Sequence, residues 1–277
     1  MTDSVSSIIA AQLGVGCSSW TYTLRSMDPF VKAPYEQFTE ARSGQGVFTF
    51  LTGEGGFLQE FLYGYTGLRW REDRLRLDPM LPPQLSGGLR LTGLRWRGRV
   101  FDVAVGRGGT TVTLKTGDAA LIDTPAGTRT LSPGARISLP TRTAGPTADN
   151  LARCRPAAAS DADPSAPAAA AVDGSPVTAW TSDADPATPS TLTVRLAGAS
   201  TIAHATVTWQ EARPLAPYRL QARSAGAWRT VALVRAVEGD VDSVSFAPRQ
   251  ADAVRLRLPA ARLGGDNPRL AELAVSL

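Results

Sequence analysis

The segment VKAPYEQFTEARSGQG (residues 31–46) carries side chains suited to chemistry. It has neither helical nor alternating periodicity, which is typical of an ordered loop, and such loops commonly bear functional groups. Glu40 follows the aromatic residues Tyr35 and Phe38, whose rings are able to line a binding site. A carboxylate in such a place can act as a general base. The alternative interpretation is that Glu40 is one of several solvated loop acids.

A glycine-rich segment follows this loop. Gly53, Gly55 and Gly56 lie between the apolar run at 47–51 and a helical pattern of apolar residues from Phe57 onward. This order predicts a glycine turn before a helix whose free N–H groups can face an anionic ligand. The alternative is plain packing of a helix against a strand. For Glu54 and Glu60, which flank the turn, the favoured role is structural, one of them capping the helix.

Short helices must position these groups. Residues 4–14 and 18–27 each carry apolar positions at helical spacing, and Asp28-Pro29 ends the second helix. Two short helices cannot enclose a core. Residues 1–66 are therefore expected to be the end of a larger helical domain.

Beyond Trp70 the pattern changes to strands. Residues 67–145 alternate apolar and polar positions between glycine-containing turns, which predicts a small antiparallel β-domain of about seven short strands. Residues 150–277 open with an Ala/Pro-rich segment that composition alone would class as a linker. Runs such as TLTVRL, TIAHATVTW and AVRLRLP follow and predict a second β-sandwich. The expected fold class is mainly β with a short helical part.

Composition narrows the function classes. The 277 residues include 29 basic and 25 acidic ones, a formal charge of +4 that is spread along the chain, which does not argue for nucleic acid. Only Lys32 and Lys115 are lysine. The first residues lack the pattern of a secretory signal, and no apolar run reaches membrane-spanning length. The compartment and the oligomeric state stay undetermined at this stage.

The run PYEQFTEARSGQGVFTFLTGEGGFLQEFLYGYTGLRW resembles the end of the catalytic domain of glycoside hydrolase family 65, in particular its trehalase-like members. The next run, REDRLRLDPMLPPQLSGGLRLTGLRWRGRVFDVAV, is similar to the small C-terminal β-domain of that family. The resemblance covers about residues 1–145. It implies an (α/α)6 barrel and an inverting mechanism on α-glucosides such as trehalose or kojibiose. Most of that barrel is absent, so the chain alone is expected to be inactive.

The same resemblance implies roles for the loop. Glu40 would be the general base, and the general acid would lie upstream of Met1. Phosphorylases of the family hold phosphate with a histidine and a serine, where this chain has Phe50 and Gly53. Water is therefore favoured over phosphate as the nucleophile. The residues expected to contact the sugar are Lys32, Tyr35, Gln37, Phe38, Gly55 and Gly56.

The remaining residues resemble the discoidin, or coagulation factor 5/8 type C, domain, which includes carbohydrate-binding module family 32. The resemblance rests on the runs AVDG (171–174), TAWT (178–181), Trp228, VRL (254–256) and AELAV (271–275). It implies a jelly-roll β-sandwich that begins within the Ala/Pro segment, which replaces the linker interpretation. It also implies a structural Ca²⁺ held by loop carbonyls near Asp173 and Thr178 and by Glu272, and core positions for Trp180 and Trp228. Without the resemblance, Asp173-Gly174 reads as an ordinary turn.

The leading hypothesis is a C-terminal fragment of a secreted-type inverting α-glucoside hydrolase with an appended carbohydrate-binding module. The expected partners are carbohydrates, namely α-glucosides and glycans. The alternatives are a carbohydrate-binding protein without catalytic activity and a disaccharide phosphorylase.

Overall fold

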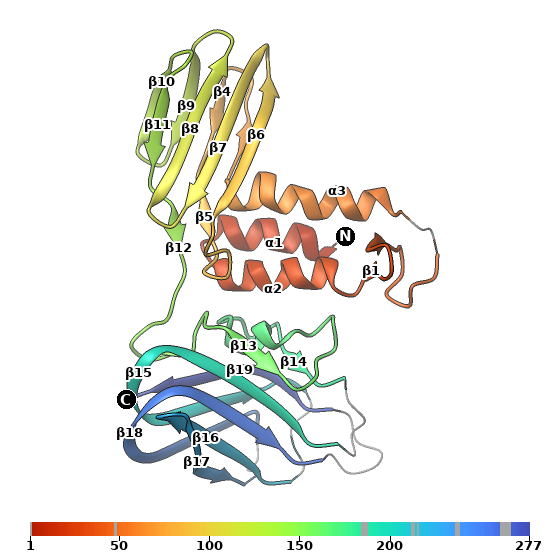
Figure 1. Ribbon diagram of the computed structural model, residues 1–277, viewed down its shortest axis with the longest axis vertical. Coiled ribbons are helices and arrows are strands. Elements are labelled where there is room, and N and C mark those ends of the chain that lie inside the picture. Colours follow the sequence, from red (N-terminus) through yellow and green to blue (C-terminus); the bar gives the residue numbers. More distant parts are fainter. Residues whose placement is uncertain are drawn as a thin grey trace. The chain divides into compact units, whose positions relative to one another are not determined.

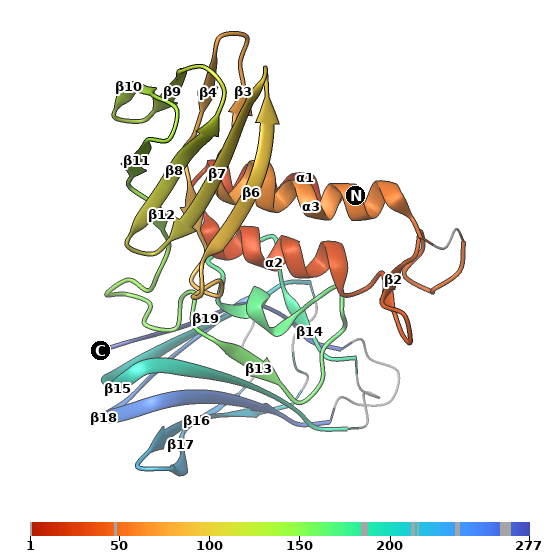
Figure 2. The same cartoon turned by 45° about the horizontal axis from the view of Figure 1, so that its top comes forward.

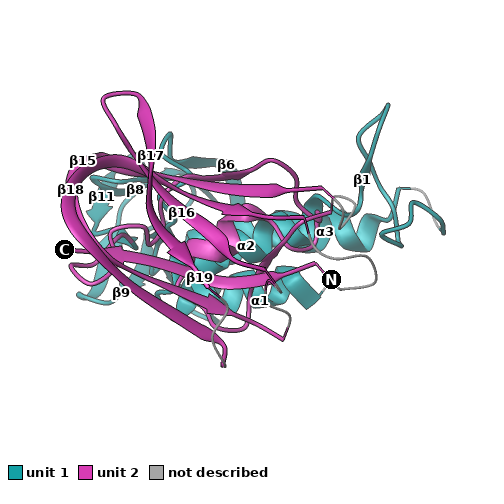
Figure 3. Cartoon of the chain, turned by 90° about the horizontal axis from the view of Figure 1, so that it is seen from below, with its two compact units in different colours: residues 1–144 teal, residues 145–277 magenta. Residues whose placement is uncertain are grey.

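The computed structural model describes residues 2–46, 49–183, 188–211, 214, 216–235, 239–260 and 267–277. The chain divides into two compact units, residues 1–144 and residues 145–277, coloured separately in Figure 3. The prediction of a mainly β protein with a short helical part is confirmed. Val47 and Phe48, which belong to the apolar run before the glycines, lie outside the described residues.

Unit 1 begins with helices that lie side by side (Figure 1). They are α1 (Thr2–Gln12), α2 (Gly16–Met27) and α3 (Leu51–Gln59), and α3 continues into the π-helix η1 (Glu60–Tyr65). Between α2 and α3 the chain forms a short hairpin of β1 (Val31–Lys32) and β2 (Gln37–Phe38). The two predicted N-terminal helices are confirmed, and the loop that carries Glu40 leaves the end of this hairpin.

The predicted glycine turn is wrong, because Gly53, Gly55 and Gly56 lie inside α3. The amides of Gly53 and Glu54 already donate to the Phe50 carbonyl, at 2.9 and 3.2 Å. Tertiary packing outweighs the low helix propensity of glycine here. A Cβ at Gly56 would lie only 3.3 Å from Ser4 Oγ, so glycine permits close packing of α3 against α1.

Two antiparallel-rich sheets complete unit 1 (Figure 2). In one, β10 (Gly127–Leu131), β9 (Ala120–Thr124), β4 (Arg74–Arg76) and β3 (Arg69–Trp70) are neighbours in this order. In the other, the order is β11 (Arg136–Leu139), β8 (Gly109–Thr116), β7 (Arg99–Gly106) and β6 (Leu89–Trp96). A parallel pair joins β5 (Met80–Leu81) to β12 (Arg142–Thr143). The strands predicted for this part of the chain are present, in greater number than the periodicity indicated, and the pairs β4–β9 and β5–β12 are parallel.

Two contacts tie the helices of unit 1 to its strands. The Arg142 guanidinium on β12 donates from Nε to Asp78 Oδ1 at 2.9 Å, and from Nη2 and Nη1 to the carbonyls of Ala11 and Gln12 at 3.1 and 3.3 Å. These are carbonyls at the C-terminal end of α1, where cationic donors stabilise a helix. Gly67, just after η1, has a φ of +63° and lies against the backbone of Asp78.

Unit 2 is a β-sandwich-type domain with two very long strands. Its elements are β13 (Ala157–Ala159), the 3₁₀-helix η2 (Ala168–Val172), β14 (Trp180–Thr181), β15 (Ser190–Trp209), β16 (Tyr218–Ser224), β17 (Ala227–Val234), β18 (Val241–Leu258) and β19 (Arg269–Ser276). The strand order is β14-β19-β15-β18-β16-β17, and β13 also pairs with β15. The runs TLTVRL and TIAHATVTW, expected as separate strands, form the single strand β15. Its pairing with β18 continues across an irregularity between Arg195 and Ser200.

The Ala/Pro-rich segment is ordered, as the resemblance implied, because it contains β13 and η2. Ala170, Ala171 and Val172 of η2 are buried. Trp180 is fully buried in the core of unit 2, which confirms its expected position. The core prediction for Trp228 is wrong. Its side chain is only half-buried, because its strand partner Arg223 lies on the side of the sheet away from the core.

Candidate functional site

The hairpin and α3 bring two of the expected site residues together. Phe38 and Glu40 line a cavity of about 20 Å³ together with residues from the three helices and the segments that connect them, namely Ser4, Ser26, Phe30, Thr39, Phe50 and Gly53. This volume suits about one water molecule. Glu40 is exposed on its other side, and the backbone of Gly46, with a φ of +95°, passes close to its carboxylate.

The other expected sugar contacts are more dispersed. Lys32 Nζ donates to the Arg42 carbonyl at 2.8 Å, and the Tyr35 side chain is 80% exposed at the hairpin tip. Gln37 lies on β2, half-buried. Gly55 and Gly56 lie within α3, and a Cβ at Gly55 would meet no atom within 4 Å. The structure therefore groups Phe38 with Glu40 and leaves Lys32 and Tyr35 at the rim.

A row of aromatic rings supports this site. Phe38 lies 6.0 Å from Phe57 between ring centroids, Phe57 lies 5.1 Å from Phe61, and Phe61 lies 5.6 Å from Tyr65. The last two pairs meet edge to face, a favourable geometry for aromatic rings. The apolar stripe predicted from Phe57 to Tyr65 thus links the Glu40 loop to the interior of unit 1.

Glu60 is a buried acid that the sequence interpretation missed. It is fully buried rather than capping a helix, and Ser26 Oγ donates to its Oε1 at 2.6 Å while Thr23 Oγ1 donates to Oε2. Burial raises the pKa of Glu60 to about 7, although these hydroxyl contacts lower it. Tyr65 joins the network through a 2.6 Å contact with Thr23, and burial raises its pKa to about 12.

Hydroxyl residues on α1 and α2 could have revealed this cluster. Ser7, Ser19, Thr23 and Ser26 recur at helical spacings, and all four are buried. Ser7 contacts Thr23 at 2.9 Å. A row of small hydroxyls at helical spacing indicates a polar partner on the facing helix. Ser26 also lines the cavity beside Glu40, so the Glu60 network lies directly behind the loop.

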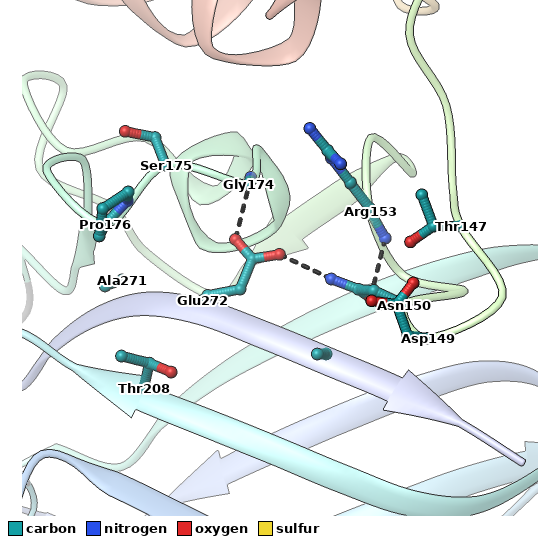
Figure 4. A pocket seen from close by; sticks show the side chains of 11 residues that line it. Thr147, Asp149, Asn150, Arg153, Gly174, Ser175, Pro176, Thr208, Ala271 and Glu272 are labelled. Carbon is teal, nitrogen blue, oxygen red and sulfur yellow. Dashed lines mark hydrogen bonds between the residues drawn. The ribbon is translucent and has the colours of Figure 1, made fainter.

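Unit 2 contains a separate pocket of about 340 Å³ built around Glu272 (Figure 4). Glu272 Oε2 accepts from the Gly174 amide at 3.0 Å, and Oε1 accepts from Asn150 Nδ2 at 2.8 Å. Burial, followed by the charge of Asp173, raises the pKa of Glu272 to about 7. Arg153 lines the same pocket, and its charge lowers this pKa.

Asp173 and Thr178 meet in the adjacent loop, both almost fully buried. Thr178 Oγ1 contacts both carboxylate oxygens of Asp173, at 3.0 and 2.9 Å, and the Ser175 amide donates to Asp173 Oδ1 at 2.9 Å. These bonds close the turn over residues 173–178. The structure thus places the three residues expected to hold Ca²⁺ in one part of unit 2.

The donor set of this region suits calcium in kind. Asp173, Thr178 and Glu272 offer only oxygen donors, which Ca²⁺ prefers. The buried carboxylate of Asp173 and the partly buried carboxylate of Glu272, whose pKa is raised, lie near each other, and a divalent cation would offset their mutual repulsion. Within the described ranges, no group of three or more His, Cys, Asp or Glu residues is placed to hold a metal ion. Carbonyl oxygens would have to complete the coordination.

Two stretches of the chain match known protein families. Residues 68–125 match the C-terminal domain of glycosyl hydrolase family 65, and residues 170–256 match the NedA-like, galactose-binding domain. The family resemblance inferred from the sequence is therefore confirmed for these two domains. In the described part of the chain, no helix has the length and apolar character needed to cross a membrane.

Curated relatives align with more of the chain than either domain match does. A cell wall acid trehalase of Arthroderma benhamiae is 31% identical over 78% of this chain and 23% of its own length. A protein-glucosylgalactosylhydroxylysine glucosidase of Danio rerio is 32% identical over 40% of this chain and 18% of its own length. The chain thus spans less than a quarter of these relatives. A solved chitosan-binding module from Paenibacillus sp. IK-5 is 28% identical over 46% of this chain and 98% of the module, with a TM-score of 0.42.

Proposed function

We propose that this chain, which joins a family 65 C-terminal domain to a galactose-binding-type domain, is the C-terminal part of an inverting α-glucoside hydrolase. Its substrates would be α-linked disaccharides such as trehalose or kojibiose, and its second unit would bind carbohydrate. The observation that supports this proposal best is the single alignment with an acid trehalase, which runs through 78% of the chain. The trehalase and glucosidase relatives favour the same class of reaction.

In this proposal Glu40 is the general base. Inversion needs a carboxylate that activates water and a carboxylic acid that protonates the leaving oxygen, held roughly 6.5–9.5 Å apart. Glu40 combines an exposed position with a water-sized cavity behind it, which suits the first role. The acid would come from the part of the catalytic barrel that precedes this chain.

Water is the proposed nucleophile. A phosphorylase would need groups that hold phosphate beside the glycines, but Phe50 and Gly53 stand there. Lys32 and Arg42 are the cations of this loop, and the ammonium group of Lys32 donates to the Arg42 carbonyl. Hydrolysis is therefore favoured over phosphorolysis, and activity that requires added phosphate would contradict this choice.

The test compares the chain alone with the longer product obtained by joining it to the coding sequence that precedes it. The longer product should release glucose from trehalose or kojibiose with the inverted anomer appearing first by NMR, and residues 1–277 alone should release none. Glu40→Gln should lower kcat by about 10²–10⁴-fold, the usual contribution of a general base. Glu36→Gln, in the same exposed loop, is the matched control.

A carbohydrate-binding protein without catalytic activity is the second candidate. It is favoured by the compactness of unit 2, which forms a separate body with its own core. A stop codon directly before this reading frame, together with glycan binding by the chain, would support it. If the longer product is active and stays active with Glu40→Gln, the assignment of Glu40 as the general base is wrong.

We also propose that unit 2 holds a structural Ca²⁺ through Asp173, Thr178 and Glu272, with carbonyl oxygens of the neighbouring loop. When bound, the ion would neutralise the two carboxylates and tie residue 272 near the C-terminus to the loop over residues 173–178. A location outside the cytoplasm is proposed for the parent enzyme, since the trehalase relative carries a cell wall designation.

A further inference from the structure

Unit 2 gathers arginine side chains on one side of its sheet. The strands β15, β18, β16 and β17 are neighbours in this order. In antiparallel pairs, directly opposite residues share a face, and every second residue of a strand returns to it. Arg219 is opposite Arg257, and Thr193 is opposite Arg255. Five residues of one face follow from this register, here called the arginine face: Arg195, Arg219, Arg223, Arg255 and Arg257.

The arginine face concentrates positive charge on one surface of a unit whose formal net charge is zero. Residues 145–277 contain 13 arginines, no lysine and 13 acidic residues. The sequence indicated basic residues spread along the chain, but folding brings five of them onto one surface. Asp252 forms an ion pair with this face, through a 2.7 Å contact with Arg223 Nε.

Two of the five arginines are held in place by their neighbours. Arg255 donates from Nε and Nη2 to Gln221 Oε1, at 3.0 and 2.7 Å. Its guanidinium carbon lies 4.3 Å from the centre of the Trp228 ring, and that of Arg223 lies 5.7 Å away. Such cation–π contacts fix the orientation of guanidinium groups that still carry further N–H donors. The half-buried position of Trp228 thus has a structural explanation.

This arrangement places like charges against one another. Arg219 and Arg257 are directly opposite on adjacent strands, which destabilises a sheet when both carry the same charge. Burial, and then the charge of Arg257, lowers the pKa of Arg255. A polyanion lying across the strands would convert this repulsion into attraction.

We propose that the arginine face binds an anionic polysaccharide that carries carboxylates along its chain. Guanidinium groups repeat along and across the strands of an open sheet surface, which suits an extended polymer with repeated charges better than one small anion. Arginine pairs with carboxylates through two parallel hydrogen bonds. The inference rests on the carbohydrate-binding role proposed for unit 2 and adds a ligand class and a surface.

The test measures binding of the full chain to polygalacturonate by isothermal titration calorimetry at low and at physiological salt. Binding should occur, should weaken as salt rises because the charges are exposed, and should fall at least tenfold in the double variant Arg219→Gln/Arg257→Gln. The matched control is Arg229→Gln on β17, which is opposite Ala222 and belongs to the other face. It should bind as the wild type does.

Three results would overturn the inference. One is an equal loss of affinity in the Arg229→Gln control, and another is tighter binding to duplex DNA or to phosphatidylglycerol vesicles than to polygalacturonate. The third is binding to neutral glycans such as dextran without binding to polygalacturonate, which would leave the carbohydrate-binding role of unit 2 intact. Failure to bind any glycan would contradict both this inference and the carbohydrate-binding role proposed for unit 2. Circular dichroism of each variant checks that its fold is retained.

Discussion

Glu60 shows how one buried acid can make the stability of a unit depend on pH. Its folded pKa of about 7 lies above the ordinary value of 4.5 for glutamate, so the protonated form is the one that the folded state favours. Between these two values the unfolded carboxyl loses its proton before the folded one does. The free energy of unfolding of unit 1 should therefore fall as pH rises from 4.5 to 7, by roughly 2–3 kcal/mol.

Glu60→Gln should remove this dependence. The amide keeps the shape of the side chain and an oxygen that can accept from Ser26 and Thr23, but it does not ionise. At pH 8 the variant should be more stable than the wild type by about 1–3 kcal/mol, measured by native-state hydrogen exchange of the α3 and η1 amides. Glu54→Gln on the same helix is the control. A free energy of opening in the wild type that does not change with pH, after correction for the intrinsic exchange rate, would contradict the prediction.

Glu272 should couple calcium to protons. Ca²⁺ binds the ionised carboxylate, so proton and ion compete for it. Adding millimolar Ca²⁺ should raise the melting temperature of the chain at pH 7.5 more than at pH 5, and Asp173→Asn should abolish the increase. Asp240→Asn, an exposed acid of the same unit, serves as the control. An equal increase in wild type and Asp173→Asn would exclude the proposed site.

At the scale of elements, the passage from η1 into β3 depends on Gly67. Its φ of +63° and its contact with the Asp78 backbone leave no room for a Cβ. Gly67→Ala should destabilise unit 1 by about 2–4 kcal/mol. Gly55→Ala, a helix-interior glycine with open space around it, should instead stabilise by about 0.5–1 kcal/mol. Urea unfolding curves measure both, and changes of the same sign would contradict the argument.

Elements with strong periodicity could be predicted from sequence, and elements shaped by packing could not. The helices around residues 4–14 and 18–27 and the period-two strands of unit 2 were expected from their apolar spacing. The start of α3 was missed, because its three glycines break the local pattern, and only packing explains them: Gly56, for example, permits the close approach to Ser4 of α1. The candidate site was found in part: Glu40 stands in a recognisable loop, whereas Glu60 gains its character only when α1, α2 and η1 meet around it.

At the scale of the whole molecule, both units should respond to pH in the same direction. Glu60 and Glu272 each have a pKa raised to about 7, so the stability that these two groups contribute is fully present below about pH 4.5 and is lost as the pH rises toward neutrality. Glu272 should contribute less because its side chain is partly exposed. Without calcium, calorimetry should give melting temperatures higher by about 5–10 °C at pH 5 than at pH 7.5.

The double variant Glu60→Gln/Glu272→Gln is the control for this prediction, since it should melt at nearly the same temperature at both pH values. A wild type that melts at a higher temperature at pH 7.5 than at pH 5 would contradict the predicted sign.

The charge of the arginine face appears only at the scale of the whole molecule, because residues far apart in sequence share it. Sequence order alone therefore showed a chain with evenly spread basic residues.

The contacts of Arg142 determine when unit 1 can complete its folding during translation. α1 leaves the ribosome well before β12, because the guanidinium group that covers its last carbonyls follows about 130 residues later. We expect the first helices to stay loosely associated during translation, and unit 1 to close only when β12 emerges. A ribosome stalled after residue 125, where the family match ends, should therefore hold a unit that proteases still cut within α1.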